Sequence, residues 1–585
     1  MTTPIGDSLR TPAETERARG RPGRVAILEQ LLADGVRYVF GNPGTVEQGL
    51  LDALGQYPNL HYVLALHETV ALAMADGYAR AARRPAIVQL HSGVGLGNGV
   101  GMMYQAMRGH APLVVLAGNA GLRYEAMDAQ MAADLVAIAE PVTKWAAEVT
   151  HPSSLLRLLR RAIKIATTPP TGPVFLALPM DVLDAQVEEE VIPTSRLITR
   201  TAPDPVQVTE VARLLASARF PMIIAGDGVA FSNAQRELGR VAEVLGAEVW
   251  GADSSEVNLS AAHPHFRGLL GHMFGEESRA ITSRADAVLI CGTYVFPEVF
   301  PSLEGVFAPG APVVHIDLDP SAIAKNFPVD VGLVSDPKQT LGRLAHALEQ
   351  SMTRDQRREA QQRSARIGVA HREGREALLK ADRQRRDEVP MHPSCFMSEL
   401  ADQAPADVLV FDEALTTSPD LTRYLVPTEP GAYFQTRGGS LGVGLPGALG
   451  LKLAHPERTV FGFAGDGGAM YTIQALWTAA HHRIGAKFVI CNNRSYRILK
   501  LNIQQYWRER ELPEAAFPRS FDLTDPDLRF DRLAESMGVP AVRVETPDQV
   551  RPAIARALET EGPFLIEVVI GGAVPSDQTH VRCGQ

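Results

Sequence analysis

The 585-residue chain has few features of a secreted, membrane or nucleic-acid-binding protein. Its four cysteines show no CxxC spacing, which argues against a zinc knuckle or a disulfide framework. Cys291 and Cys491 lie in apolar runs, so we expect core residues. No stretch of about 20 uninterrupted apolar residues is present, and the net charge of −10 argues against a general phosphate-backbone binder. These absences predict a reducing, cytoplasmic compartment, no membrane association and no nucleic-acid partner.

Three further segments lack the apolar patterning of a folded core. Residues 1–22 are polar and have no signal-peptide-like apolar region, so we interpret them as a disordered tail. Residues 573–585 predict a second tail. Residues 351–389 are dense in charge and poor in large apolar side chains. We expect a solvated helical linker there, with an interaction arm as the alternative.

The remainder of the chain alternates short apolar runs with segments of helical spacing. This pattern occurs at 23–190 (PAIVQL, PLVVLAG, GPVFLAL), at 203–350 (PMIIAGDG, ADAVLICG, APVVHIDLD) and at 390–572 (VLVFDEAL, RTVFGFAGDGG, KFVICNN). Buried parallel strands with helices on both faces produce such alternation. The predicted fold class is therefore α/β, with three doubly wound parallel-sheet domains. The GDG at 226–228 is interpreted as a strand-end turn.

The stretch from Val460 to Leu499 carries the clearest chemical pattern. One apolar run ends in Gly465-Asp466-Gly467-Gly468, and the next ends in Asn492-Asn493. If both runs are parallel strands, their carboxyl ends meet at one sheet edge, so Asp466 and Asn493 come close together. A carboxylate and an amide oxygen are ligands that suit Mg²⁺, and a helix beginning near Ala469 would direct its first amides at a phosphate. The stretch predicts a diphosphate held through a divalent cation.

The GDGGAM and NN pair, with 27 positions between Asp466 and Asn493, resembles the thiamine diphosphate signature. The resemblance extends to FGNPGTVEQ at 40–48, HETVALAMADGYARA at 67–81, QLHSGVGLGNGVG at 89–101, SLGVGLPGALG at 440–450 and ALWTAAHHRI at 475–484. The chain resembles the pyruvate oxidase and decarboxylase group, most closely benzoylformate decarboxylases, and is also acetolactate synthase-like. This implies pyrimidine-binding (PYR), middle and diphosphate-binding (PP) domains at the three ranges above, and thiamine diphosphate with Mg²⁺ as cofactors.

The resemblance assigns cofactor roles residue by residue. Glu68 matches the carboxylate that activates the aminopyrimidine ring, although by itself it is a first-turn helix glutamate. Leu441 matches the bulky residue beneath the thiazolium, although by itself it is a core leucine. The implied metal ligands are Asp466, Asn493 and Ser495. The implied contacts with the rest of the cofactor are Thr416, Thr417, Gly465, Gly467, Gly468 and Ala469; the two threonines can equally be helix caps.

Substrate residues match less evenly. Thr45 lies where the family contacts a substrate carboxylate, and His91 matches a general acid. The family's second histidine has no match at 293–310, and His272 is the nearest candidate. Gln435, Ile498 and Asn502 align with pocket positions, where the two amides weaken the case for an aromatic substrate. Residues Arg494, Arg497 and Lys500 form either a cationic rim or a solvated helix face.

The implied activity is decarboxylation of a 2-oxo acid to an aldehyde. The alternatives are a carboligase of the acetolactate synthase type, an acyl-CoA lyase supported by the basic segment 494–500, and an inactive scaffold. FAD is not expected, because ICGTYVFPEVF near 290–300 lacks the arginine-containing flavin motif. The resemblance also implies a homodimer or homotetramer with active sites at the dimer interface.

Overall fold

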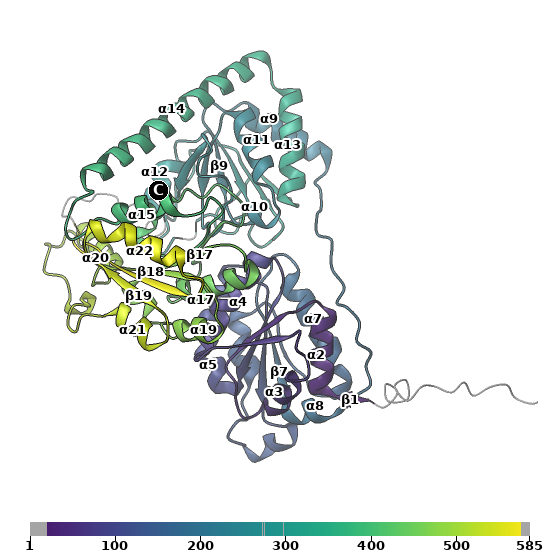
Figure 1. The fold of residues 1–585 in the computed structure, drawn as a ribbon. Coiled ribbons are helices and arrows are strands. Elements are labelled where there is room, and N and C mark those ends of the chain that lie inside the picture. The colour runs from purple at the N-terminus through teal and green to yellow at the C-terminus, as the bar shows by residue number, and fades with distance from the viewer. Residues whose placement is uncertain (1–19, 272, 274, 297, 575–585) are drawn as a thin grey trace, which may run out of the picture. The chain divides into compact units, whose positions relative to one another are not determined.

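The computed structural model describes residues 20–271, 273, 275–296 and 298–574 (Figure 1). The chain divides into two compact units, one ending at Leu197 and the other beginning at Ile198, and each is described by itself. Residues 1–19 and 575–585, which contain most of the two predicted tails, lie outside the described residues, as does His272.

The N-terminal unit is built on a six-stranded parallel sheet in the order β3-β2-β4-β5-β7-β6. Its strands are β2 (Tyr38–Gly41), β3 (His61–Leu64), β4 (Ala86–His91), β5 (Leu113–Asn119), β6 (Ala146–Glu148) and β7 (Val174–Pro179). Its helices are α2 (Gly23–Ala33), α3 (Gln48–Leu54), α4 (Glu68–Ala82), α5 (Ser92–Arg108), α6 (Leu135–Ala139), α7 (Leu155–Thr167) and α8 (Met180–Asp184). The short strands β1 (Arg21–Pro22) and β8 (Gln186–Val187) pair antiparallel.

Strand order in this sheet reverses between β2 and β4. The chain places β3 on one side of β2 and then crosses to place β4 on the other side. A crevice forms where two such connections diverge, at the carboxyl ends of the strands. The loop after β2 begins at Asn42, and β4 ends at His91. Two of the stretches that carry the family resemblance therefore meet at this crevice.

The second unit begins with another six-stranded parallel sheet, in the order β11-β10-β9-β12-β13-β14. Its strands are β9 (Pro221–Ala225), β10 (Glu248–Gly251), β11 (Phe266–Leu269), β12 (Ala287–Cys291), β13 (Val313–Asp317) and β14 (Val331–Val334). Its helices are α9 (Pro205–Ala216), α10 (Gly228–Phe231), α11 (Gln235–Leu245), α12 (Gly275–Thr282) and α13 (Pro337–Ser351). Alternate residues of β9 enter two different hydrophobic clusters, as expected for a sheet covered on both faces.

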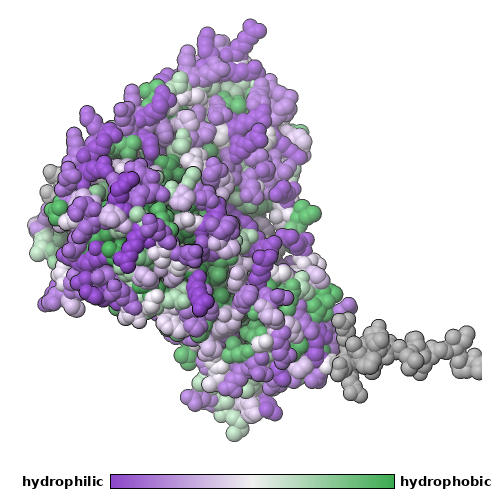
Figure 2. Space-filling view, in the orientation of Figure 1, coloured by the Kyte–Doolittle hydropathy of each residue, from purple (hydrophilic) through white to green (hydrophobic). Residues whose placement is uncertain are grey.

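The predicted charged linker is largely one helix, α14 (Arg354–Gln384), which begins with a capping box formed by Thr353 and Gln356. Figure 2 shows hydrophilic side chains over this helix, in agreement with its charge-dense sequence. The helix is nevertheless anchored, because Ala360 and Arg363 are buried and Arg363 donates to the Leu245 carbonyl at 2.6 Å. The linker is thus helical as predicted, but one face packs on α11 of the middle domain and is not solvated.

The third sheet has the order β16-β15-β17-β18-β20-β19. Its strands are β15 (Leu409–Glu413), β16 (Tyr433–Gln435), β17 (Val460–Gly465), β18 (Lys487–Asn492), β19 (Ala541–Val544) and β20 (Phe564–Val569). Its helices are α15 (Pro393–Gln403), α16 (Ser418–Tyr424), α17 (Gly444–Ala454), α18 (Asp466–Ala469), α19 (Ala475–His481), α20 (Arg497–Glu509), α21 (Phe530–Ser536) and α22 (Pro547–Glu559), with the 3₁₀ turn η4 (Leu415–Thr417). Strand order reverses between β15 and β17, so the segments after Glu413 and Gly465 share the crevice.

The prediction of three doubly wound parallel sheets is confirmed. Cys291 and Cys491 are buried in the core as expected. None of the described helices is long and apolar enough to cross a membrane. One expected boundary is wrong: the helix expected to begin near Ala469 is preceded by α18, which ends at that residue, and the longer α19 begins only at Ala475. Thr472, between them, donates its hydroxyl to the Gly442 carbonyl at 2.8 Å, which holds this turn against another loop.

Candidate functional site

Glu68 is the first residue of α4 and is 6% exposed. Its Oε1 accepts a hydrogen bond from Asn42 Nδ2 at 3.2 Å, and its Oε2 accepts one from Asn98 Nδ2 at 3.1 Å. Both donors are neutral amides, so they orient the carboxylate without neutralising its charge. The preceding residue, His67, caps the helix by accepting from Thr69 N at 3.2 Å. The helix cap is therefore supplied by His67, and the Glu68 carboxylate is directed into a small polar cluster.

His91 ends β4 beside a buried carboxylate that the sequence interpretation missed. Its Nδ1 lies 3.0 Å from Glu47 Oε2, while Glu47 Oε1 accepts from Gly118 N at 2.9 Å. Glu47 is 1% exposed; burial raises its pKa, and the contact with His91 acts in the opposite direction. Because Nδ1 faces Glu47, a further partner of the ring would use Nε2.

Close packing brings the predicted residues of this unit together. A Cβ added to Gly95 would lie 3.0 Å from Glu68 Oε1 and 3.4 Å from His91 Cβ, so both residues border the same glycine. A Cβ on Gly44 would lie 2.0 Å from the His91 ring. The loop that carries the exposed Thr45 therefore crosses directly over His91, and the glycines are required for this approach. Thr45, Glu68 and His91 form one local group.

Asp466, Asn493 and Ser495 form a second group, in the other unit. Asp466 Oδ2 accepts from Ser495 N at 3.2 Å, and its Oδ1 accepts from Gly467 N at 2.8 Å. Asn493 Oδ1 accepts from both Ser495 N and Ser495 Oγ at 3.0 Å. Burial raises the pKa of Asp466 to about 6, against the lowering effect of nearby backbone amides. Three hard oxygen donors thus cluster at the ends of β17 and β18, as the sequence predicted.

The neighbouring Asn492 has a different environment. It is 1% exposed, donates from Nδ2 to Glu567 Oε1 at 2.8 Å and accepts from Arg494 N at 3.1 Å. Both polar groups of its side chain are therefore used in hydrogen bonds within the domain. The two adjacent asparagines therefore have separate tasks, which their sequence does not distinguish.

Leu441 lies in a loop held by the fully buried Glu413. The Gly442 and Gly444 amides donate to the two Glu413 oxygens at 2.6 and 2.7 Å. Burial raises the pKa of Glu413 to about 7, although both amides lower it. Gly442 has φ +92°, a conformation that favours glycine, and its close neighbour Leu441 is half-buried. Glu413, which the sequence interpretation passed over, positions the segment on which Leu441 stands.

The remaining predicted residues surround this crevice unevenly. Thr416 and Thr417 are buried in η4, and the Thr417 hydroxyl has no hydrogen-bond partner among the described residues. Ile498 and Asn502 are half-buried and four positions apart on α20, a helix that contacts η4. Gly465 is the last residue of β17, and Gly467, Gly468 and Ala469 lie in the short helix α18 that follows it. Gln435 is different, because its backbone N donates to Ser255 O, in the middle domain, at 2.8 Å.

The structure bears in part on two expectations, a cationic rim at 494–500 and a second active-site histidine. Arg494 is paired with Asp527 at 3.1 Å, and Lys500 lies 5.7 Å from the Phe517 ring centroid, so neither stands alone as part of a cationic rim. His272, the candidate second histidine, lies outside the described residues. The middle-domain His315 is 2% exposed and bonded through Nε2 to Thr293 O at 2.8 Å, a structural arrangement.

Comparison with known proteins follows the same division of the chain. Residues 22–138 match the thiamine pyrophosphate enzyme N-terminal TPP binding domain, residues 208–344 the central domain, and residues 416–568 the C-terminal TPP binding domain. Benzoylformate decarboxylase from Pseudomonas aeruginosa is 33% identical over 93% of this chain and 98% of its own. A probable acetolactate synthase large subunit from Methanocaldococcus jannaschii is 28% identical over 94% and 92%.

A solved structure is similar over the same length. It is the thiamine diphosphate-dependent 4-hydroxybenzoylformate decarboxylase of Rhodococcus jostii RHA1, with a TM-score of 0.80, 27% identity, and coverage of 94% of this chain and 99% of that one. The comparisons thus agree with both enzyme types named by the sequence resemblance.

Proposed function

The chain belongs to the thiamine pyrophosphate enzyme family, and on that basis we propose that it decarboxylates a 2-oxo acid to an aldehyde, using thiamine diphosphate and Mg²⁺. The observation that carries the proposal is the setting of Glu68, a buried carboxylate oriented by two neutral amides beside the His91–Glu47 pair. Such an arrangement brings a carboxylate hydrogen-bond acceptor and an imidazole into one local group.

The residues present fit the two cofactors. Asp466, Asn493 and Ser495 offer carboxylate, amide and hydroxyl oxygens within hydrogen-bond distance of one another, a donor set that suits Mg²⁺. The buried, unpartnered Thr417 hydroxyl, with Thr416 beside it, is available to a diphosphate oxygen. Leu441 would support the thiazolium. When bound, thiamine diphosphate would supply an electron sink for the electron pair that stays on the substrate carbon when carbon dioxide leaves.

The side chains of the chain itself handle protons and orientation. Glu68 would hold a proton shared with the aminopyrimidine ring, because its carboxylate is oriented but not neutralised. Thr45, exposed in the loop over His91, would donate its hydroxyl to the substrate carboxylate. His91, fixed through Nδ1 by Glu47, would deliver a proton from Nε2 to the substrate-derived oxygen. Asn502 and Ile498 would form part of the substrate pocket.

A carboligase remains the second candidate, because the acetolactate synthase relatives match nearly the whole chain. In that reaction the fragment left after decarboxylation is not protonated. It forms a carbon–carbon bond with the carbonyl carbon of a second compound. An acyl-CoA lyase is less favoured, since the basic segment 494–500 that supported it includes Arg494, which is already paired with Asp527. An inactive scaffold is disfavoured by the orienting contacts of Glu68, which a structural copy would not need.

The deciding experiment supplies thiamine diphosphate, Mg²⁺ and a panel of aliphatic and aromatic 2-oxo acids, with and without an acceptor aldehyde. Carbon dioxide and product are both measured. Aldehyde formation in equal yield with carbon dioxide supports the decarboxylase, whereas carbon dioxide accompanied by a new carbon–carbon bond supports the carboligase. If no donor releases carbon dioxide, both reactions are wrong. Flavin absorbance of the purified protein is recorded with the same sample, because FAD is not expected.

We also propose that the active form is a homodimer, or a homotetramer made from such dimers, in which different subunits supply Glu68 and the metal ligands of one site. Mixing inactive Glu68→Gln and Asp466→Ala chains would then restore about one quarter of wild-type activity, because half of the dimers contain one intact site. No recovery after verified subunit exchange would contradict the shared site. The cytoplasmic compartment stays a prediction, to be checked by cell fractionation.

A further inference from the structure

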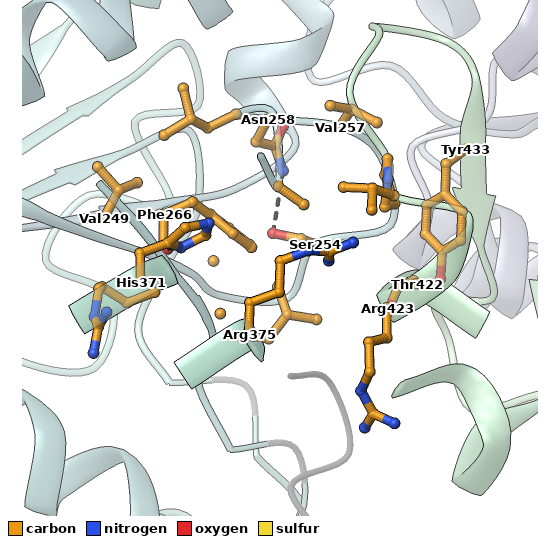
Figure 3. A pocket seen from close by; sticks show the side chains of 18 of the residues that line it. Val249, Ser254, Val257, Asn258, Phe266, His371, Arg375, Thr422, Arg423 and Tyr433 are labelled. Atoms are coloured by element: carbon orange, nitrogen blue, oxygen red, sulfur yellow. Dashed lines mark hydrogen bonds between the residues drawn. The ribbon is translucent and has the colours of Figure 1, made fainter. Parts of the chain in front are cut away.

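A cavity of about 560 Å³ lies within the second unit (Figure 3), and the residues assigned to Mg²⁺ are not among those that line it. Its walls come from β10 and β11 of the middle sheet, from α14, and from α16 and β16 of the C-terminal domain. Val249, Phe266 and Leu269 provide apolar surface on one side, and Tyr433 contributes an aromatic ring on the other. A volume of several hundred Å³ with mainly apolar walls is typical of a small-molecule site.

One face of α14 lines the cavity. His371, Arg375 and Leu378 recur at the three- and four-residue spacing that places side chains on one side of a helix. Gly374 lies on the same face, and a Cβ added there would meet nothing within 4 Å. Leu378 is 41% exposed, so the cavity is open to solvent along this helix. The predicted linker helix therefore forms one wall of the cavity, and the space next to Gly374 is unfilled.

The charged groups around the cavity differ in whether they are already paired. Arg423 is bound to Asp382 at 2.7 Å and to Asp420 at 2.9 Å. Arg267 lies 3.7 Å from Glu248. Arg375, in contrast, has no carboxylate within ion-pair distance among the described residues. Arg375 is thus the cation whose charge is still available.

Arg375 extends from α14 into the cavity, toward Ser254, in Figure 3. Ser254 accepts from Asn258 Nδ2 at 3.1 Å, so hydroxyl and amide groups lie on the side that Arg375 approaches. Burial and the nearby arginines, Arg375 among them, lower the pKa of His371, whereas the bond from its Nδ1 to Phe266 O at 3.0 Å acts in the opposite direction. The wall also contains Glu256, which is 6% exposed and already engaged. The cavity combines one available guanidinium with a large apolar surface.

We propose that this cavity binds a small monocarboxylate with an apolar body, and that Arg375 pairs with the carboxylate. A guanidinium recognises a carboxylate through two parallel hydrogen bonds, and the apolar walls favour an alkyl or aryl group over a sugar or a polyphosphate. A ligand there would touch Ser418, which directly follows Thr417. The site is separate from the proposed reaction and does not depend on it.

Gln435 belongs to this cavity and not to the residues that we assign to the substrate pocket. It was expected in the substrate pocket, but it lines the present cavity, and its backbone is joined to Ser255 of the middle domain. A bound monocarboxylate would therefore contact both domains of the second unit and the helix between them. Occupancy should hold these three parts together more firmly.

Octanoate is the probe, titrated calorimetrically into the full-length protein. We expect octanoate to bind saturably at one site per chain in this cavity, in addition to any octanoate that binds at the active site. Arg375→Gln should weaken it about tenfold or more, because a charged hydrogen-bond partner is lost. Arg372→Gln is the matched control, since it removes the same charge from an exposed neighbour on α14 outside the cavity wall, and affinity should be unchanged. Gly374→Leu should abolish binding by filling the open space.

Two further probes test the chemistry of the ligand. Octan-1-ol, which has the apolar body without the charge, should bind at least about tenfold more weakly than octanoate. Inorganic phosphate should not compete. The proposal is overturned if octanoate shows no saturable binding, if Arg375→Gln binds it as well as the wild type, or if phosphate displaces it. Circular dichroism of each variant confirms that a loss of binding does not reflect misfolding.

Discussion

Arg437 joins the C-terminal domain to the middle domain by donating from Nη2 to Asp253 Oδ2 at 2.7 Å, and its Nη1 is bonded to Asp227. Arg437 is 6% exposed and Asp227 is 2% exposed. Asp227 also accepts from Ser255 N at 3.0 Å and from Asn258 Nδ2 at 3.0 Å. The strand-end turn predicted at 226–228 is therefore the anchor of a buried polar network between two domains.

Replacing Arg437 by methionine should destabilise the second unit by about 3–5 kcal/mol, because the buried Asp227 and the partly buried Asp253 both lose their cation. Urea unfolding followed by tryptophan fluorescence measures the loss. Arg532→Met is the control: its pair with Glu535 is 71% and 52% exposed, and such surface pairs contribute at most about 1 kcal/mol. An Arg437→Met variant as stable as this control would show that the network contributes little.

The sequence predicted those parts of the fold that depend on local pattern. Apolar runs separated by helical segments were sufficient for three parallel sheets, and the strand-end positions of Asp466, Asn493 and His91 followed from them. Polar residues that directly follow parallel strands all lie at the same edge of the sheet, because the carboxyl ends of parallel strands meet there. The groups at the centre of each crevice were accordingly the most predictable.

The residues that were missed depend on contacts between distant segments. Glu47 becomes a partner of His91 because the loop after β2 crosses β4, and Glu413 becomes the support of Leu441 because another loop returns over β15. In the sequence both glutamates resemble ordinary strand-end or helix-start acids. The buried face of α14 was missed for a similar reason, since its apolar contacts are made by small residues and by an arginine stem.

Glu413 should give the protein a distinctive pH dependence. Burial raises its pKa from 4.5 to about 7 in the folded state, so its contribution to stability is fully present below about pH 4.5 and is lost as pH rises through about 7. Glu413→Gln is neutral at every pH but loses one of the two backbone hydrogen bonds. The variant should be less stable than the wild type at about pH 5, and the wild type should lose about 2.5 kcal/mol relative to the variant on going to pH 8.

Urea unfolding at both pH values tests this expectation. Hydrogen exchange adds a local measurement, because the peptide containing Gly442 and Gly444 should exchange about tenfold or more faster in the variant. A peptide covering β4, in the other unit, serves as the internal reference. A pH-independent stability difference would show that Glu413 is ionised throughout the range.

Alanine substitution of the two adjacent asparagines should affect two different properties, metal binding for Asn493 and stability for Asn492. Asn493→Ala removes a proposed Mg²⁺ ligand and should weaken Mn²⁺ binding, measured by electron paramagnetic resonance with thiamine diphosphate present, by about tenfold or more. Asn492→Ala removes the hydrogen bond to Glu567 from a buried site and should cost about 1–3 kcal/mol of unfolding free energy. Loss of metal binding in Asn492→Ala without loss of stability would reverse the assignment of the pair.

The His91–Glu47 contact should act as one unit in catalysis. His91→Ala removes the proposed proton donor and should lower kcat by about 10²–10⁴-fold, while Glu47→Gln leaves the imidazole present but alters the partner of its Nδ1. If Glu47 acts through His91, the double variant should be no slower than His91→Ala alone, because no oriented imidazole remains to be lost. The pH profile of kcat should shift in Glu47→Gln and stay unchanged in Gln48→Ala, which changes the exposed next residue, the first of α3. Multiplicative losses in the double variant would instead assign Glu47 a task independent of His91, such as holding the Gly118 amide and the end of β5 in place.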